Sequence, residues 1–148
     1  MKQTKAKVGG ALDETLSDVL TLDLAVRQGR RNCSGKGFST AQRFLDGLAD
    51  AAREAGHGLA ARSVHLHHMP SLWEETTARQ HALRLVGSET FSEAETLSAF
   101  TQILASITRR LTANIRATDC DLVTQALLIR LSVRLDTIAE TIHSRRAA

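Results

Sequence analysis

The residues best suited to chemistry in this chain are a carboxylate and an imidazole on one expected helix. Asp46 and His57 are eleven residues apart, about three helical turns, so their side chains project within roughly 20° of each other. Carboxylate and imidazole are ligands that iron favours, and Asp50 offers a further acid nearby. The face of the expected helix that carries Asp46 and His57 is therefore polar, and it fits either a solvated strip or a contact with another subunit.

Two Glu-x-x-His pairs, Glu54 with His57 and Glu140 with His143, have the spacing seen in di-iron bundles, which need one pair on each of two helices. If those helices run antiparallel, the residue facing His57 lies near position 130. His143 then falls about 20 Å further along at the helical rise. The spacing argues against a di-iron site inside one chain.

Three histidines, His65, His67 and His68, follow the second expected helix. Three imidazoles suit zinc or iron. Positively charged side chains are also favoured at a helix C-terminus by the helix dipole, and we favour this second interpretation.

The beginning of the chain is basic, with Lys2, Lys5 and Lys7, and Arg145 and Arg146 lie near its other end. The net charge is only +3. Short basic segments often contact phosphate groups. The three lysines are therefore candidates for non-specific DNA binding, with a simply solvated tail as the alternative.

Cysteine usage and hydropathy indicate the compartment. The two cysteines, Cys33 and Cys120, give neither a disulfide framework nor metal-ligand spacing. Gly9 and Gly10 follow the basic start in place of an apolar signal core, and no apolar run approaches membrane-spanning length. We expect a cytoplasmic protein with reduced thiols and no membrane partner.

The elements that position these residues are helices. The chain has a single proline, is 43% apolar and 24% charged, and is rich in Ala, Leu, Arg and Glu, which lose least on entering a helix. Apolar residues recur every three or four positions in four long segments that begin near residues 12, 39, 92 and 119. Capping-box spacing marks starts at Ser39 and Ser92, and a third box at Ser71 opens a short helix that carries Trp73.

Connection lengths predict how the helices are arranged. The first and second helices are joined by a short loop, as are the third and fourth, so each pair is expected to be antiparallel. One long middle crossover of roughly 25 residues is the ferritin-like arrangement. We predict an all-α, ferritin-like four-helix bundle over residues 11–146, with a short helix in the crossover between helices two and three, after a flexible basic tail over residues 1–10.

The stretch over residues 30–38 resembles a motif of the starvation-inducible DNA-binding ferritins, the Dps family, in which His-Trp-Asn-x-x-Gly-x-x-Phe is followed by a His and then an Asp. Four residues match that pattern without a gap: Asn32, Gly35, Phe38 and Asp46. Residues 121–128 and 135–136 look like the start and middle of the family's last helix. The resemblance covers nearly the whole chain apart from the middle crossover.

The resemblance implies a hollow dodecamer that binds Fe(II) where two subunits meet, oxidises it with peroxide and stores the mineral. It also implies DNA binding through basic tails, as in many members of the family.

Most of the family's ligand positions are changed in this chain. Arg30 and Gln42 stand where the family has two His ligands, and His57 and Ala61 where it has an Asp and a Glu, so only Asp46 is kept. Guanidinium and methyl groups do not ligate iron. We expect a degenerate site with at most weak iron oxidation, in which Arg30 neutralises Asp46 across the subunit interface.

Asp119 and Asp121 begin the last helix and resemble the acidic residues that line a pore at the three-fold axis of the family's shells. Carboxylates at a helix start also act as caps and favour the dipole, and the two roles are compatible. Gly56-His57-Gly58 interrupts the second helix at a cost of about 1 kcal/mol per glycine, and close approach of another backbone is one candidate reason.

The sequence therefore predicts a Dps-like protein that forms an oligomeric shell, by resemblance a dodecamer, and that binds DNA, with a nucleoid location. Two alternatives stay open. One is a ferroxidase with an altered site built from Asp46, His57 and a nearby acid such as Asp50. The other is a non-catalytic subunit that co-assembles with an active homologue.

Overall fold

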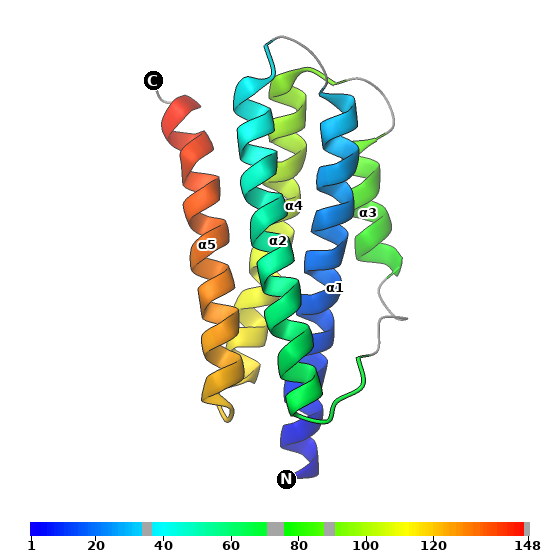
Figure 1. Cartoon of the computed structure of the whole chain (residues 1–148), viewed down its shortest axis with the longest axis vertical. Coiled ribbons are helices and arrows are strands. Elements are labelled where there is room, and N and C mark those ends of the chain that lie inside the picture. The colour runs from blue at the N-terminus through cyan, green and yellow to red at the C-terminus, as the bar shows by residue number, and fades with distance from the viewer. Residues whose placement is uncertain (34–36, 71–75, 88–90, 147–148) are drawn as a thin grey trace.

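The chain folds into five helices in the computed structural model of Figure 1, and no strand occurs in the described residues. The structure describes residues 1–33, 37–70, 76–87 and 91–146, with the backbone alone at 76–79 and 145–146. The helices are α1 (Lys2–Asn32), α2 (Ser39–His65), α3 (Thr76–Val86), α4 (Glu93–Ala117) and α5 (Leu122–Arg146).

The four long helices α1, α2, α4 and α5 lie side by side, and α3 packs against α1 and α4 (Figure 1). Short connections join α1 to α2 and α4 to α5, and the path from α2 to α4 carries α3. The predicted class is confirmed as an all-α four-helix bundle with a short helix in a long crossover. The predicted start of that helix at Ser71, together with Trp73, lies outside the described residues.

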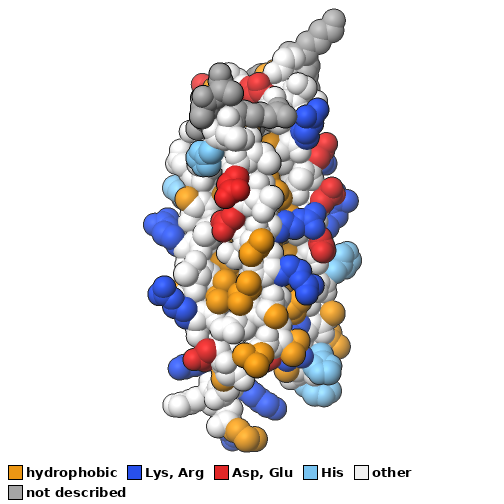
Figure 2. All heavy atoms as spheres, turned by 90° about the vertical axis from the view of Figure 1, so that its left-hand side faces the viewer, with side chains coloured by type: hydrophobic (Ala, Val, Ile, Leu, Met, Phe, Trp, Pro, Cys, Tyr) orange, Lys and Arg blue, Asp and Glu red, His pale blue; other side chains and the backbone are white. Residues whose placement is uncertain are grey.

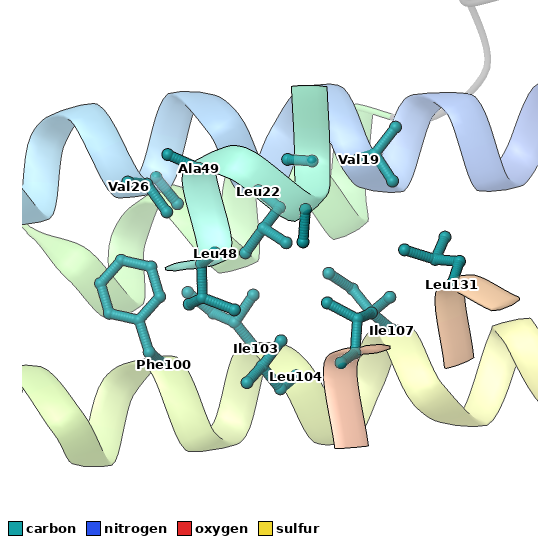
Figure 3. Close-up of a cluster of buried hydrophobic side chains, with 14 of the residues drawn as sticks. Val19, Leu22, Val26, Leu48, Ala49, Phe100, Ile103, Leu104, Ile107 and Leu131 are labelled. Carbon is teal, nitrogen blue, oxygen red and sulfur yellow. The ribbon is translucent and has the colours of Figure 1, made fainter. Parts of the chain in front are cut away.

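One apolar core holds the bundle together, because α1, α2, α4 and α5 each turn a stripe of residues three or four apart toward it. Figure 3 shows Leu22, Leu48, Phe100 and Leu131 converging on this core, one from each long helix. The Phe100 ring also meets Phe44 edge to face, with ring centroids 6.3 Å apart, which is a favoured aromatic geometry.

Helix α1 begins earlier than the sequence analysis predicted. The segment expected to be a flexible tail, residues 1–10, is helical from Lys2 onward. Burial is the reason, because Val8 and Ala11 are each 4% exposed and extend the apolar face of Leu12 by a further turn. The basic residues therefore sit on the exposed first turns of a helix.

The starts of α2 and α4 are capped in different ways. At α4 the predicted box is formed, since Ser92 Oγ accepts from the Glu95 amide and Glu95 Oε2 accepts from the Ser92 amide. The predicted box at Ser39 is not formed, although α2 does begin there. Glu93 of α4 replaces it, because its Oε1 accepts from the Ala41 amide at 2.8 Å and so satisfies one of the free N–H groups at the start of α2.

Two helical glycines should respond in opposite ways to substitution by alanine. A Cβ on Gly29 would lie 2.8 Å from Phe100 Cε2, and overpacking of this kind costs about 1–3 kcal/mol. A Cβ on Gly56 meets nothing within 4 Å, so Gly56→Ala should raise the free energy of unfolding by about 0.5–1 kcal/mol through helix propensity. Denaturant unfolding of both variants measures the change in the free energy of unfolding. A decrease in Gly56→Ala would show that a second chain approaches there.

Candidate functional site

The first candidate position is Asp46, which lies in the second turn of α2 beside the end of α1. Arg30 Nη2 donates to Asp46 Oδ1, and the two form an ion pair. Arg30 and Asp46 were predicted to pair across two subunits, but the pair forms within one chain. The physical reason is the short connection, which folds α2 back along the last turn of α1 and brings residue 46 level with residue 30.

The other positions that correspond to the family's iron ligands do not form a cluster around Asp46. His57 and Ala61 are exposed further along α2, and Gln42 Nε2 donates to the Cys33 carbonyl oxygen at 3.3 Å. Eleven residues of helix separate His57 from Asp46 by about 16 Å, too far for one metal ion to bind both within a chain. In the part of the chain that the structure describes, no group of three or more His, Cys, Asp or Glu side chains is placed to hold a metal ion.

Every carboxylate of α2 faces an arginine. Besides the Arg30–Asp46 pair, Asp50 lies 3.5 Å from Arg53 Nη2, and Glu54 pairs with Arg134 of α5. Arginine carries a permanent charge and offers only donors, so it competes with a cation for the carboxylate. Each of the three α2 acids is therefore engaged in an ion pair within the chain.

Contacts between α2 and α5 show which residues of the two helices lie at the same level along the bundle, and so whether the two Glu-x-x-His pairs face each other. A Cβ on Gly58 would lie 3.7 Å from Leu127, and one on Gly47 would lie 3.9 Å from Ile138. His57 is thus level with residues just after Leu127, close to the predicted position 130. His143 belongs to the opposite end of α5, so Glu140 and His143 face no part of the Glu54–His57 pair.

The first predicted pore residue, Asp121, caps α5 and closes an ion pair inside the chain. Its carboxylate accepts from Arg62 Nη2 at 2.8 and 2.9 Å and from Thr124 Oγ1 at 2.8 Å. Burial opposes its charge, but the hydrogen bonds from Arg62 and Thr124 outweigh burial and lower the pKa of Asp121 below its ordinary value. Asp119 is exposed on the same turn. A pore at a symmetry axis stays a prediction for both residues.

The histidine cluster is divided among separate environments. His68 Nε2 lies 2.9 Å from Asp13 Oδ1, and its ring covers Gly9, where a Cβ would come within 2.6 Å. His65 and His67 are exposed. Of the three, His68 has a defined role, which is to fasten the beginning of the crossover onto α1.

Sequence reasoning missed a buried ion pair between α1 and α4. Arg110 Nε and Nη2 donate to Asp18 at 2.7–3.1 Å, and Asp18 is only 5% exposed. Burial raises the pKa of Asp18 in spite of the hydrogen bonds from Arg110. Nothing in the spacing of either residue marked them as partners, since 92 positions separate them along the chain.

The three predicted DNA-binding lysines are all exposed on the first turns of α1. They lie at the end of the bundle marked N in Figure 1, beyond the point where α2 ends. Lys2, Lys5 and Lys7 are therefore accessible to a large anionic partner, and their binding of DNA stays a prediction. No helix among the described residues is long and apolar enough to span a membrane.

Comparison with known proteins establishes the fold. The helical order, the long crossover and the single core define a ferritin-like bundle. The solved structure of the Dps92 from Deinococcus radiodurans is similar, with a TM-score of 0.82 and 18% sequence identity over 96% of this chain and 87% of that chain. No family model and no curated protein matches the sequence. At this identity the likeness shows a shared fold.

The Arg62–Asp121 pair predicts a specific acid sensitivity. Asp121→Asn should lower the free energy of unfolding at neutral pH by about 1–2 kcal/mol, since it removes a charge-assisted pair and leaves Arg62 without its partner. Because the folded-state pKa of Asp121 lies below the ordinary 3.8, its contribution is complete above that pH and is lost as the pH falls through the folded value. The difference from the wild-type protein should therefore shrink in acid.

Asp119→Asn is the matched control for this prediction, because Asp119 is an exposed carboxylate on the same turn. Its free energy of unfolding should stay close to that of the wild-type protein at every pH. Equal effects of the two substitutions in denaturant titrations would show that Arg62 contributes nothing through Asp121.

Proposed function

We propose that this protein is a Dps-like subunit of a hollow oligomeric shell that binds and protects DNA and has at most weak iron oxidation or storage. The ferritin-like fold and the similarity to Dps92 over nearly the whole chain support a shell-forming role. By the family resemblance the shell is a dodecamer, in the cytoplasm and associated with the nucleoid.

The Arg30–Asp46 ion pair is the main observation that supports weak iron oxidation in this proposal. Asp46 is the one acid kept among the expected ligand positions, and its carboxylate is held by a guanidinium. Fe(II) as a substrate would have to displace a permanent cation and then share the site with it. Gln42 and Ala61 add one amide and one methyl group at the remaining positions, and neither is a good iron ligand.

The outer face of α2 is the surface we assign to contact with another subunit. Asp46 and Asp50 lie toward its beginning, and Arg53 and His57 lie further along. Two copies packed antiparallel across this face would set the acidic half of each against the basic half of the other, as an isologous contact requires.

Two other functions compete with this proposal. A ferroxidase could use an altered site made of Asp46, Asp50 and His57 if a second chain completed the ligand set. A non-catalytic subunit co-assembling with an active homologue would share the fold and the substitutions. The Arg30–Asp46 pair counts against the first, and the second differs from our proposal only in the partner.

Native mass spectrometry before and after addition of Fe(II) and peroxide tests the shell and its iron chemistry together. We expect an oligomer whose mass gains little iron. Fe(II) consumption should be slow and unchanged in Asp46→Ala, because Asp46 is engaged by Arg30. Rapid oxidation that Asp46→Ala abolishes would establish the ferroxidase instead, and a protein that assembles only with a homologue would establish the partner subunit.

DNA binding is tested by substitution, since deletion of residues 1–8 would also remove the buried Val8. Changing Lys2, Lys5 and Lys7 together to Gln should weaken the mobility shift of duplex DNA at low salt. The slope of log affinity against log salt should fall by roughly 0.9 for each DNA phosphate that a lysine no longer neutralises, and repetition of the lysines around an oligomer amplifies the effect.

The control removes the same charge from other surfaces. Arg43, Arg84 and Arg109 are exposed and lie on α2, α3 and α4, and their replacement by Gln should leave most of the DNA shift in place. If both triple variants bind DNA equally well, the first turns of α1 are not the DNA-binding surface.

A further inference from the structure

A groove with an apolar floor runs between α2 and α5, and we call it the α2–α5 groove. It holds a cavity of about 210 Å³. Ala51, Leu59 and Leu131 form the floor, since they line the cavity and are only 1%, 2% and 5% exposed. Ala55 and Leu127 line its walls and are partly buried. Apolar atoms of a ligand that settled on this floor would be removed from water.

The α2–α5 groove is long and narrow. Its lining residues extend from Ala51 to Leu59 on α2 and from Leu127 to Arg134 on α5, which is about 10–12 Å on each helix at the helical rise. A Cβ on Gly58 would lie 3.7 Å from Leu127 Cδ2, so the space beside Gly58 belongs to the groove and admits a methyl group. The volume is below the roughly 300–1,000 Å³ of pockets for drug-sized ligands, and the shape fits one short alkyl chain.

The rim of the groove carries more basic than acidic side chains. Arg130 and Arg134 lie about one turn apart on α5, and Glu54 is the acid that lines the α2 side. Arg134 is engaged by Glu54, whereas exposed Arg130 forms no salt bridge with any described residue. Figure 2 faces the α5 side of the molecule, and basic, acidic and hydrophobic side chains lie next to one another right of its centre. One guanidinium at the rim is therefore not balanced by a nearby carboxylate.

We propose that the α2–α5 groove binds a small monocarboxylate with a short alkyl chain, the chemistry of a medium-chain fatty acid. The Arg130 guanidinium donates to the carboxylate, because its planar fork matches both carboxylate oxygens. The alkyl chain lies on Leu59 and Leu131. One unbalanced positive charge suits a monoanion, whereas a phosphate dianion would bring a second negative charge close to Glu54.

The dimensions and charge of the groove favour a small ligand over a macromolecule. A helix is about 10–12 Å wide with its side chains, too wide for a groove of 210 Å³. DNA and anionic membrane surfaces present many negative charges and bind clusters of basic side chains, whereas this rim offers one unpaired guanidinium. A single carboxylate with an apolar chain satisfies both the rim and the floor.

The groove is separate from the surfaces assigned to the shell. At 100° per residue, Glu54, Ala51 and Gly58 point on average about 110° around α2 from the outer face that carries Asp46 and His57. On α5, the first groove residue is six positions beyond Asp121, about 9 Å along the helix. A subunit contact on α2 and a pore at the start of α5 do not use the groove residues, and the inference does not rest on the proposed shell function.

Titration calorimetry of the full chain with sodium octanoate tests this site. We expect one saturable site per chain with a dissociation constant of about 1 mM or below, as a ligand of about ten non-hydrogen atoms allows. Acetate lacks the alkyl chain and 1-octanol lacks the charge. Each should bind about tenfold more weakly than octanoate or not at all, because each satisfies only the rim or only the floor.

Substitutions at the rim should change octanoate affinity in opposite directions. Arg130→Gln should raise the dissociation constant about tenfold or more, because the charge-assisted hydrogen bonds are lost. Arg109→Gln is the matched control, since it removes the same charge from an exposed position on α4. Glu54→Gln should lower the dissociation constant about threefold, because it releases Arg134 to face the ligand. A merely structural disturbance would raise it, and circular dichroism establishes that each variant folds.

A pair of glycines tests the floor. Gly58→Ala and Gly56→Ala both place a methyl group on α2, but the Gly58 methyl enters the groove and the Gly56 methyl meets open space. Gly58→Ala should weaken octanoate binding about threefold or more, and Gly56→Ala should leave it unchanged. The proposal is overturned if octanoate binds no better than 1-octanol, if Arg130→Gln keeps wild-type affinity, or if another chain covers the groove and no saturable binding occurs. The oligomer mass in native mass spectrometry decides the shell proposal separately.

Discussion

Four amphipathic helices can remove their leucine faces from water only by turning them toward a common axis, and every other feature of this molecule depends on that packing. Leu12, Leu48, Leu111 and Leu128, one from each long helix, are all 1% exposed or less. Burial of this apolar surface is the main favourable term in the free energy of folding. It also determines which residues are left to meet one another on the outside of the bundle.

Arginine–carboxylate pairs between neighbouring helices are the second level of organisation. Arg110 with Asp18 joins α4 to α1, Arg30 with Asp46 joins α1 to α2, and Arg134 with Glu54 joins α5 to α2. Removal of one partner would be most destabilising in the buried Asp18–Arg110 pair, because the remaining ion would stay buried without an opposite charge. The exposed pairs contribute little energy.

The two outward surfaces have different character. The outer face of α2 carries ion-paired acids, an exposed histidine and a glycine with open space beside it, whereas the outer face of α5 carries the exposed apolar residues Leu122, Ile129 and Val133. The candidate DNA-binding lysines lie on neither surface, at the projecting start of α1.

The amino-acid sequence by itself determined the all-α class, the four long helices, the crossover and the capping box at Ser92, because hydrophobic period and caps are local properties. It also identified Arg30 and Asp46 as partners. Only the tertiary structure decided that they pair within one chain, that Asp18 meets Arg110, that Glu93 caps α2 and that residues 2–10 belong to α1. These outcomes depend on which helices become neighbours and at what depth. Apolar period defines the face that a helix buries but leaves open its register against the next helix, so contacts across helices follow from the packed bundle.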